Sequence, residues 1–236
     1  MSDTEVAKSQ FEEIDMALQD RLDAFKTDFE TNKAPPSVVA IMHKATADLA
    51  ASGQADRALK AGAAAPAFEL PDAHGKPVRS ADLLARGPLV ITFYRGVWCP
   101  YCNMDLQALE DAADEIRSLG ASLVAISPQT APNRRKSERE NALSFPILSD
   151  HGNALADKFG LRFRLPDELI AVYKGFGNDL AVGNGEPSWT LPMPARYIID
   201  SNGVIAYAEV NADYTKRPDP SELVPVLRRL QRDAAA

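Results

Sequence analysis

The sequence has few of the residues that staple small secreted domains together or hold metal ions. Its 236 residues include only two cysteines, Cys99 and Cys102, and three histidines. Two cysteines cannot build a disulfide-stapled scaffold or a four-cysteine metal site within one chain. The histidines, His43, His74 and His151, lie far apart without the spacing of metal ligands. The sequence therefore predicts neither a metal site nor a disulfide-rich secreted fold.

Excess positive charge and long apolar runs are also lacking. The formal net charge is −7, from 26 Lys and Arg against 33 Asp and Glu. This balance argues against a protein that binds nucleic acid or an anionic membrane, because phosphate contacts need a basic face. No stretch approaches the ~18 consecutive apolar residues of a membrane span. The first ten residues lack the apolar core of a secretion signal, so we expect a cytoplasmic location.

Apolar residues at spacings of three and four predict two amphipathic helices before residue 60. The first covers residues 11–29, and the second extends from Val38 to Leu49, after the helix-starting Pro35-Pro36. These helices either pack as a hairpin on the main domain or form a seam that pairs with another subunit in a homodimer. Both alternatives stay open.

A stretch of small residues, 61–66, is typical of a linker. It divides the chain into an N-terminal helical extension, residues 1–60, and a main domain, residues 61–236. The main domain alternates strands and helices in an order that matches a thioredoxin-like α/β fold, a mixed sheet with helices on both faces. The predicted elements are a hairpin around 72–75, strands at 89–94, 123–126, 145–148, 197–199 and 204–210, and helices at 102–116, 133–143, 153–159 and 222–230, with Asn153 as a helix cap. Residues 161–192 are predicted to be a loop with one short helix.

One motif carries chemistry: Trp98-Cys99-Pro100-Tyr101-Cys102, directly after a predicted buried strand and at the start of a predicted helix. Two thiols across a first helical turn can approach the ~5.5 Å Cα separation that a disulfide needs. The unpaired N–H groups of a helix N-terminus favour the thiolate, the form that attacks disulfides and peroxides. We therefore predict redox chemistry. The alternatives are half of a zinc site, which lacks its other ligands, and two inert buried cysteines.

Further motifs resemble one known family. From about Lys60 onward, about three quarters of the chain resembles the AhpC/TSA peroxiredoxins, specifically the peroxiredoxin-like group that bears a CxxC motif. Besides that motif, the segments that carry the resemblance, in the family's order, are Ala65–Asp72, Thr92–Tyr94, Val124–Ser127, Phe145–Asp150 and Tyr197–Asp200.

The resemblance implies a thiol-dependent peroxidase, an antioxidant enzyme that reduces hydrogen peroxide or organic hydroperoxides without a cofactor. Cys102 falls on the family's peroxide-attacking cysteine and would become a sulfenic acid. Cys99 would then condense with it to form a Cys99–Cys102 disulfide. A thioredoxin-like dithiol or glutathione would reopen that disulfide.

Three positions depart from the family pattern and resemble thioredoxins instead. Cys99 stands where the family has Thr or Ser, Arg95 where it has Pro, and Pro194 where it has a peroxide-orienting arginine. Arg95 or Arg196, two residues after Pro194 on the same strand face, would replace that arginine. Trp98 would either cover the thiols or pack in the core, because an indole ring is often mostly buried. The likeness to thioredoxins also implies a cis peptide bond before Pro194.

Two other functions stay open at this point. A thiol–disulfide oxidoreductase, with thioredoxin- or glutaredoxin-like exchange, would use Cys99 as its nucleophile and Cys102 to resolve the mixed disulfide. A regulatory sensor would use the same disulfide to rearrange the N-terminal helices. The first alternative is favoured by the local sequence Cys-Pro-Tyr-Cys, which is also that of glutaredoxins.

Overall fold

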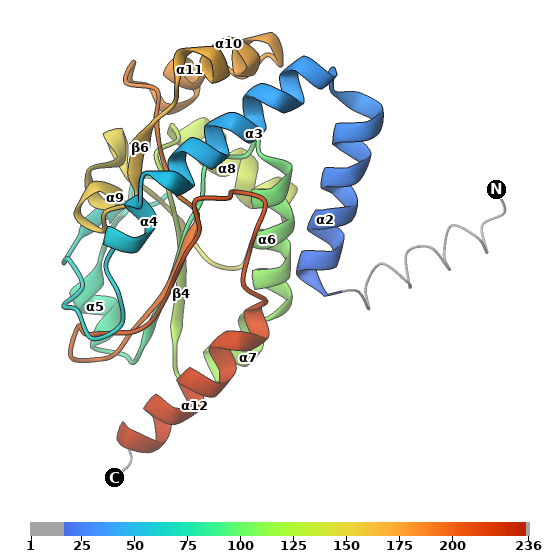
Figure 1. Ribbon diagram of the computed structural model, residues 1–236. Coiled ribbons are helices and arrows are strands. Elements are labelled where there is room, and N and C mark those ends of the chain that lie inside the picture. Colours follow the sequence, from blue (N-terminus) through green and yellow to red (C-terminus); the bar gives the residue numbers. More distant parts are fainter. Residues whose placement is uncertain (1–16, 235–236) are drawn as a thin grey trace, which may run out of the picture.

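A five-stranded mixed sheet forms the centre of the computed structural model, which describes residues 17–234 (Figure 1). The strand order is β5-β4-β3-β8-β9; β3, β4 and β5 are parallel, and β8 and β9 are antiparallel to their neighbours. The strands are β3 (Leu89–Phe93), β4 (Ser122–Ser127), β5 (Ile147–Ser149), β8 (Ala195–Ile199) and β9 (Ile205–Val210). The predicted thioredoxin-like α/β sheet is confirmed, and the strand predicted at 145–148 is β5, which covers residues 147–149 at the edge of the sheet.

The central strand β3 is buried along its whole length, as its continuous apolar sequence LVITF predicts. Its side chains alternate between two cores. Val90 packs in one core, and Ile91 and Phe93 pack in the other. Because side chains on a strand alternate between faces, each face of the sheet needs its own cover of helices.

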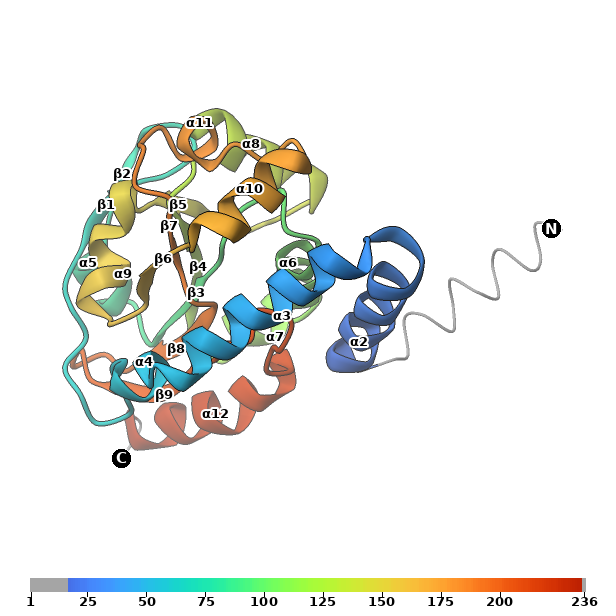
Figure 2. The ribbon, with the colours of Figure 1, turned by 45° about the horizontal axis from the view of Figure 1, so that its top comes forward.

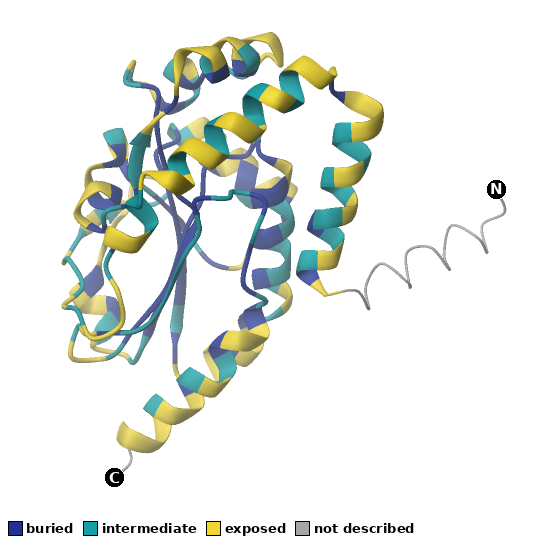
Figure 3. Ribbon diagram, viewed as in Figure 1, coloured by how far each residue is buried: buried dark blue, intermediate teal, exposed yellow. Residues whose placement is uncertain are grey.

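Helices provide that cover on both faces of the sheet (Figure 3). One face is covered by α6 (Pro100–Asp111), α7 (Ala113–Ser118) and α12 (Leu223–Ala234). The other is covered by α5 (Ser80–Leu84), η2 (His151–Asn153) and α9 (Ala154–Lys158). The predicted hairpin is formed by β1 (Glu69–Pro71) and β2 (Pro77–Arg79). Two further elements of the main domain are α8 (Ala131–Glu140) and the short η3 (Pro220–Glu222). No helix within residues 17–234 is long and apolar enough to cross a membrane.

The N-terminal helices lie against the main domain. They are α2 (Leu18–Asp28), the π-helical η1 (Phe29–Lys33), α3 (Pro36–Ala51) and the short α4 (Gln54–Arg57). Leu18 and Leu22 are buried in the same core as α6, and α3 crosses in front of the sheet in the view of Figure 2. The start of the first predicted helix, at residue 11, lies outside the described residues. The division at residue 60 and the homodimer stay predictions.

Leu22→Ala is expected to lower the free energy of unfolding by about 2–5 kcal/mol, because it leaves a cavity in a core where Leu22 is fully buried. Urea unfolding of the purified chain measures this loss. Packing within one chain predicts a midpoint that does not depend on protein concentration. A midpoint that rises with concentration would instead mean that Leu22 is buried between subunits. Val182→Ala, at a site that is 75% exposed, is the matched control.

Residues 161–192 contain more regular structure than predicted. They form β6 (Arg162–Arg164), α10 (Asp167–Gly175), α11 (Leu180–Asn184) and β7 (Thr190–Pro192), and β6 pairs with β7. Their apolar side chains build a small core of their own, with Leu169, Tyr173 and Leu191 among its members. Strands of three residues are too short to show a period, which is why the pattern indicated a loop.

Asn153 is not the side-chain cap that its position predicts. The cap comes from Asp150, whose carboxylate accepts hydrogen bonds from the backbone N–H groups of Leu155 (2.7 Å) and Ala156 (2.8 Å). Asn153 has a φ of 57° and donates its side-chain amide to the Thr190 carbonyl at 3.0 Å. The carboxylate one turn earlier satisfies the free N–H groups of α9 and leaves the asparagine to tie the helix to β7.

Candidate active site

The CxxC motif lies at the junction of β3 and α6, as predicted. Cys99 is the residue before the first helical turn, and its carbonyl accepts the N–H groups of Cys102 and Asn103, each at 3.1 Å. Pro100 occupies the first helical position, where its missing N–H costs nothing. Both cysteines are free thiols, 2% exposed for Cys99 and 0% for Cys102.

The two thiols differ in acidity. Burial disfavours the thiolate of Cys102, but a hydrogen bond from Cys99 and the charges of Arg217 and Arg95 outweigh it and lower the pKa of Cys102 to about 6. The pKa of Cys99 is raised instead, by burial and by its hydrogen bond to Cys102. Cys102 is therefore the sulfur that is ionised at neutral pH.

Arg217 is the cation in direct contact with this sulfur. Its Nη2 donates to Cys102 Sγ at 3.5 Å, and its side chain is 97% buried. It belongs to the loop of residues 211–219 between β9 and η3, which runs beside α6 (Figure 1). The backbone carbonyls of Tyr214 and Lys216 accept from its Nη1 at 2.6 and 2.7 Å. These hydrogen bonds hold the guanidinium in a position from which it can donate a hydrogen bond to the Cys102 thiolate.

Helix α2 anchors the loop that carries Arg217. The side-chain amide of Gln19 accepts the Arg217 backbone N–H at 3.1 Å and donates to the Thr215 carbonyl at 3.3 Å. Asp23, one turn further along α2, pairs with Lys216 at 2.9 Å. The N-terminal helix thus holds three successive residues of the loop.

Asp105 balances the charge of two buried arginines. Its carboxylate pairs with Arg196 and lies 3.5 Å from Nε of Arg217. Arg196 also donates to the Pro218 carbonyl at 2.9 Å, so it too supports the loop. Arg196 therefore contacts Asp105 and the loop, and these in turn contact or carry Arg217, the neighbour of the Cys102 sulfur. Arg217, and not Arg196, is the guanidinium that touches Cys102.

Arg95 lies among aromatic rings on the other side of the motif. Its guanidinium carbon is 4.1 Å from the ring centroid of Tyr214, 4.9 Å from Trp98 and 5.5 Å from Tyr173. It also donates a hydrogen bond to the Tyr173 hydroxyl. Such contacts hold a cation by its attraction to the ring faces. The backbone and the charge of Arg95 both help to stabilise the Cys102 thiolate.

Two cavities adjoin Arg95, and both are lined by Arg95, Tyr173 and Tyr214. The smaller, about 190 Å³, is also lined by Cys99 and Trp98. Its outer wall includes residues of the N-terminal helices, namely Phe25, Phe29 and Met42. The larger, about 290 Å³, contains Pro194 and lies against α3 and α10.

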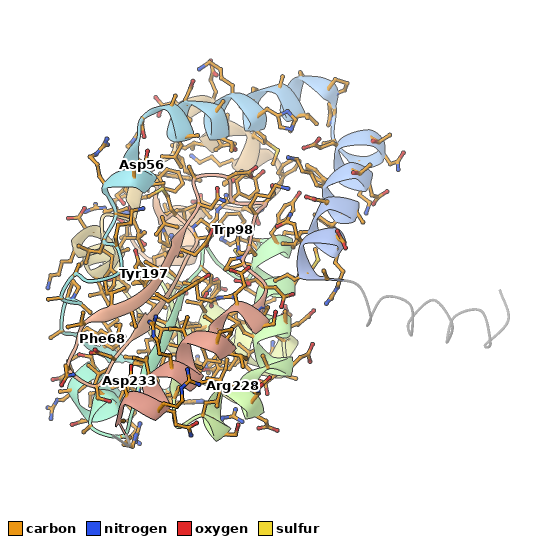
Figure 4. The ribbon with its side chains drawn as sticks, turned by 60° about the horizontal axis from the view of Figure 1, so that its bottom comes forward. Asp56, Phe68, Trp98, Tyr197, Arg228 and Asp233 are labelled. Carbon is orange, nitrogen blue, oxygen red and sulfur yellow. The ribbon has the colours of Figure 1, made fainter. Side chains whose placement is uncertain are left out.

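Trp98 and Pro194 have different relations to the thiols. Trp98 lies among the packed side chains below α3 (Figure 4) and lines the same cavity as Cys99; that it covers the thiols stays a prediction. Pro194 lines only the larger cavity. All peptide bonds of the described residues are trans, so the cis bond predicted before Pro194 is wrong. Pro194 lies in the two-residue connection between β7 and β8, and its peptide bond keeps the trans form that X–Pro bonds favour.

The structure brings together four of the six predicted site residues: Cys99, Cys102, Arg95 and Trp98. Sequence reasoning missed Arg217, Tyr173 and Tyr214, which come from a loop and a helix far from the motif. Nothing in the local pattern marks Arg217, since it lies between Lys216 and Pro218 in a loop without hydrophobic periodicity. No cluster of three metal-ligating side chains occurs within the part of the chain that the structure describes.

The sheet order and the CxxC pair after β3 define a thioredoxin-like redox protein. The model of the AhpC/TSA family matches residues 61–208. The chain belongs to the AhpC/TSA family. The predicted family and the peroxiredoxin-like enzyme class, a thiol-dependent peroxidase, are thereby confirmed.

Individual relatives agree with this assignment. The chain is 28% identical over 169 residues to the chloroplastic peroxiredoxin Q of Oryza sativa subsp. japonica, covering 72% of this chain and 67% of that protein. It is 32% identical over 103 residues to peroxiredoxin Bcp of Escherichia coli K12, covering 44% of this chain and 65% of that protein.

Solved structures share the fold. Peroxidoxin BcpB from Mycobacterium tuberculosis superposes with a TM-score of 0.57 at 24% identity, covering 72% of this chain and 97% of the other. Reduced Prx3 from Vibrio vulnificus, solved with hydrogen peroxide, gives 0.56 at 17% identity, covering 72% and 99%. The N-terminal helices and Arg217 lie outside the residues that match the family.

Proposed function

We propose that Cys102 reduces a hydroperoxide and that Cys99 resolves the product. The Cys102 thiolate attacks the terminal oxygen, the O–O bond breaks, and the alcohol or water leaves after taking up a proton. Cys102 is then a sulfenic acid. The Cys99 sulfur attacks it, water leaves, and a Cys99–Cys102 disulfide forms. Two electrons from a thiol reductant restore both thiols.

The observation that carries this proposal is the contact between Arg217 and Cys102. A guanidinium within 3.5 Å of the sulfur favours the thiolate before the reaction. The same cation can stabilise the negative charge that develops on the leaving oxygen. Arg217 therefore performs what the family's arginine would do at the position that Pro194 occupies here.

The thiol–disulfide exchange alternative requires Cys99 as the attacking thiolate. Burial and the neighbouring Cys102 raise the pKa of Cys99, so its thiolate is disfavoured at neutral pH. Arg217 stabilises the other sulfur. The geometry supports a peroxidase with Cys102 as nucleophile over exchange that begins at Cys99.

We further propose a cytoplasmic location, because a disulfide that must be reopened in every cycle requires a reducing compartment. The reductant is a thioredoxin-like dithiol or glutathione. We also propose a homodimer, formed through the outward faces of the N-terminal helices. Their inward faces are already occupied, since Leu18 and Leu22 pack in the core of their own chain.

Stopped-flow mixing of the reduced protein with hydrogen peroxide tests the function, with the fluorescence of Trp98 as a reporter next to Cys99. Because the thiolate reacts, we expect the rate to rise with pH, to reach half its maximum near pH 6 and to level off above it. A rate no greater than that of a free thiol such as N-acetylcysteine would contradict the proposal. So would a midpoint near the ordinary cysteine pKa of ~8.5.

A further inference from the structure

Arg95 is a buried cation without a carboxylate partner. It is 2% exposed, and no carboxylate of residues 17–234 lies within 4 Å of its guanidinium. Its Nε has no hydrogen-bond partner among those residues. Buried charges in proteins are normally paired, because an unpaired one loses its hydration without compensation. The aromatic rings and one tyrosine hydroxyl compensate only in part.

The other two arginines of the site are balanced differently. Arg196 and Arg217 share Asp105, and Glu209 lies across the β8–β9 pair from Arg196. For Arg95, the nearest groups that can carry negative charge are tyrosine hydroxyls and the two cysteine sulfurs. At neutral pH the Cys102 thiolate is the ionised group among these, so this sulfur, which also contacts Arg217, supplies negative charge near Arg95 in the reduced enzyme.

Oxidation removes that counter-charge. Both sulfurs of a Cys99–Cys102 disulfide are neutral, so Arg95 is then left without an anionic neighbour. Taking up an anion from solution would restore the balance. The oxidised enzyme should therefore bind an anion beside Arg95 more tightly than the reduced enzyme does.

Of the two cavities that adjoin Arg95, the one that is also lined by Cys99 limits the size of an anion that can react there. Its volume of about 190 Å³ leaves room for several water molecules or a small organic anion. Aromatic side chains of α2 and η1, Phe25 and Phe29, line it together with Cys99, and Cys102 does not line it. A small molecule fits this space, whereas the active-site loop of a folded protein would require the N-terminal helices to move.

The chemistry of the disulfide also favours attack at Cys99. A thiolate that attacks one sulfur expels the other, and a sulfur of lower pKa leaves faster. Attack on Cys99 expels Cys102, the more acidic of the two thiols. The sulfur that lines the cavity is thus also the one whose attack releases the better leaving group.

We propose that a small thiol bearing a carboxylate reduces the oxidised enzyme directly, with its carboxylate on Arg95 and its sulfur attacking Cys99. This inference rests on the proposed function, which supplies the disulfide. The thiolate forms a bond to Cys99 Sγ as the Cys99–Cys102 bond breaks, and Cys102 departs as a thiolate. A second thiol attacks the mixed disulfide, the small-molecule disulfide leaves, and Cys99 is a thiol again.

The same charge balance assists product release. Once Cys102 is a thiolate again, Arg95 regains its counter-charge and its affinity for the carboxylate falls. The anion site is therefore open when the reductant is needed and closed when the cycle is complete.

The test starts from protein oxidised with diamide, so that it does not depend on the reaction with peroxide. Reduction is followed with 3-mercaptopropionate, neutral 2-mercaptoethanol and cationic cysteamine, each rate being divided by that thiol's rate with hydroxyethyl disulfide. We expect a preference of about tenfold or more for 3-mercaptopropionate over 2-mercaptoethanol, the size of one hydrogen bond to a charged group. Propionate, which has no thiol, should inhibit the carboxylate thiol competitively.

Arg95→Gln should abolish the preference while leaving some reduction by the neutral thiol, and Arg95→Lys should retain part of it. Arg229→Gln, at an exposed position of α12, is the matched control and should leave the preference unchanged. Equal corrected rates for the three thiols would overturn the proposal, as would an undiminished preference in Arg95→Gln. If Arg95→Gln does not fold, a failure of propionate to inhibit the wild-type protein would overturn it equally. Peroxide reactivity measured separately shows whether the proposed function itself holds.

Discussion

Cys102→Ser is expected to abolish hydroperoxide reduction, with a loss of about 10³-fold or more, because a serine hydroxyl is not ionised at neutral pH and is a far weaker nucleophile than a thiolate. The positive environment that Arg217 and Arg95 provide cannot ionise a hydroxyl. Stopped-flow consumption of hydrogen peroxide by the reduced variant measures the loss. Retention of the wild-type rate would show that the attacking sulfur lies elsewhere.

Cys99→Ser is the matched variant. It keeps Cys102 and a hydroxyl that can still donate a hydrogen bond to it, so the first equivalent of peroxide should react at a rate near that of the wild type. No disulfide can follow, and a Cys102 sulfenic acid should accumulate. Trapping with dimedone and mass spectrometry would identify it. If Cys99→Ser instead loses the first turnover while Cys102→Ser keeps it, the two roles are reversed.

Arg217→Gln is expected to slow the peroxide reaction at pH 7 by about tenfold or more. With a pKa of about 6, roughly nine tenths of Cys102 is thiolate at pH 7. At the ordinary cysteine value of ~8.5 the fraction would be about 3%, so complete loss of activation corresponds to about thirtyfold. Arg95 remains in the variant and limits this effect, whereas the lost stabilisation of the leaving oxygen adds to it.

The sign of the pH dependence identifies the cause. Removing the cation raises the pKa of Cys102, so the rate should recover as the pH rises above 8 and the thiol ionises. Ultraviolet absorbance of the thiolate gives the pKa directly. Arg217→Lys retains the charge and should lie between the wild type and Arg217→Gln. Arg229→Gln removes an exposed charge on α12 that does not touch the loop, and it should leave the pKa unchanged.

The sequence predicts the frame of the active site well because that frame depends on local patterns. The apolar run of β3 and the three-and-four spacing of α6 place Cys99 and Cys102 at a strand-to-helix junction, where the structure has them. Short-range rules also predict the strands at 197–199 and 204–210, which the structure pairs as β8 and β9. Each of these features is decided within about ten residues of chain.

The charges around the sulfur could not be predicted in this way. Arg217 is 115 residues away from Cys102 in the sequence, in a loop without hydrophobic periodicity. The strand position of Arg196 predicts that its side chain lies near the thiols. In the structure, the guanidinium forms an ion pair with Asp105 on α6 instead of contacting a sulfur. Which of several buried arginines reaches a given atom depends on competition among long-range partners, and the spacing of residues along the chain does not record that competition.

The two hydrogen bonds that the Gln19 side chain forms with residues 215 and 217, here called the Gln19 clamp, link the N-terminal helix to the active-site loop. They limit which part of the chain can work alone. The family-matched unit, residues 61–208, contains both sulfurs but neither the clamp nor the guanidinium that it holds in place. A chimaeric protein that contains only this unit would have both cysteines but would lack Arg217, the cation that lowers the pKa of Cys102. A substitution at Gln19 in the first helix is therefore expected to change the acidity of Cys102, a thiol inside the family-matched unit.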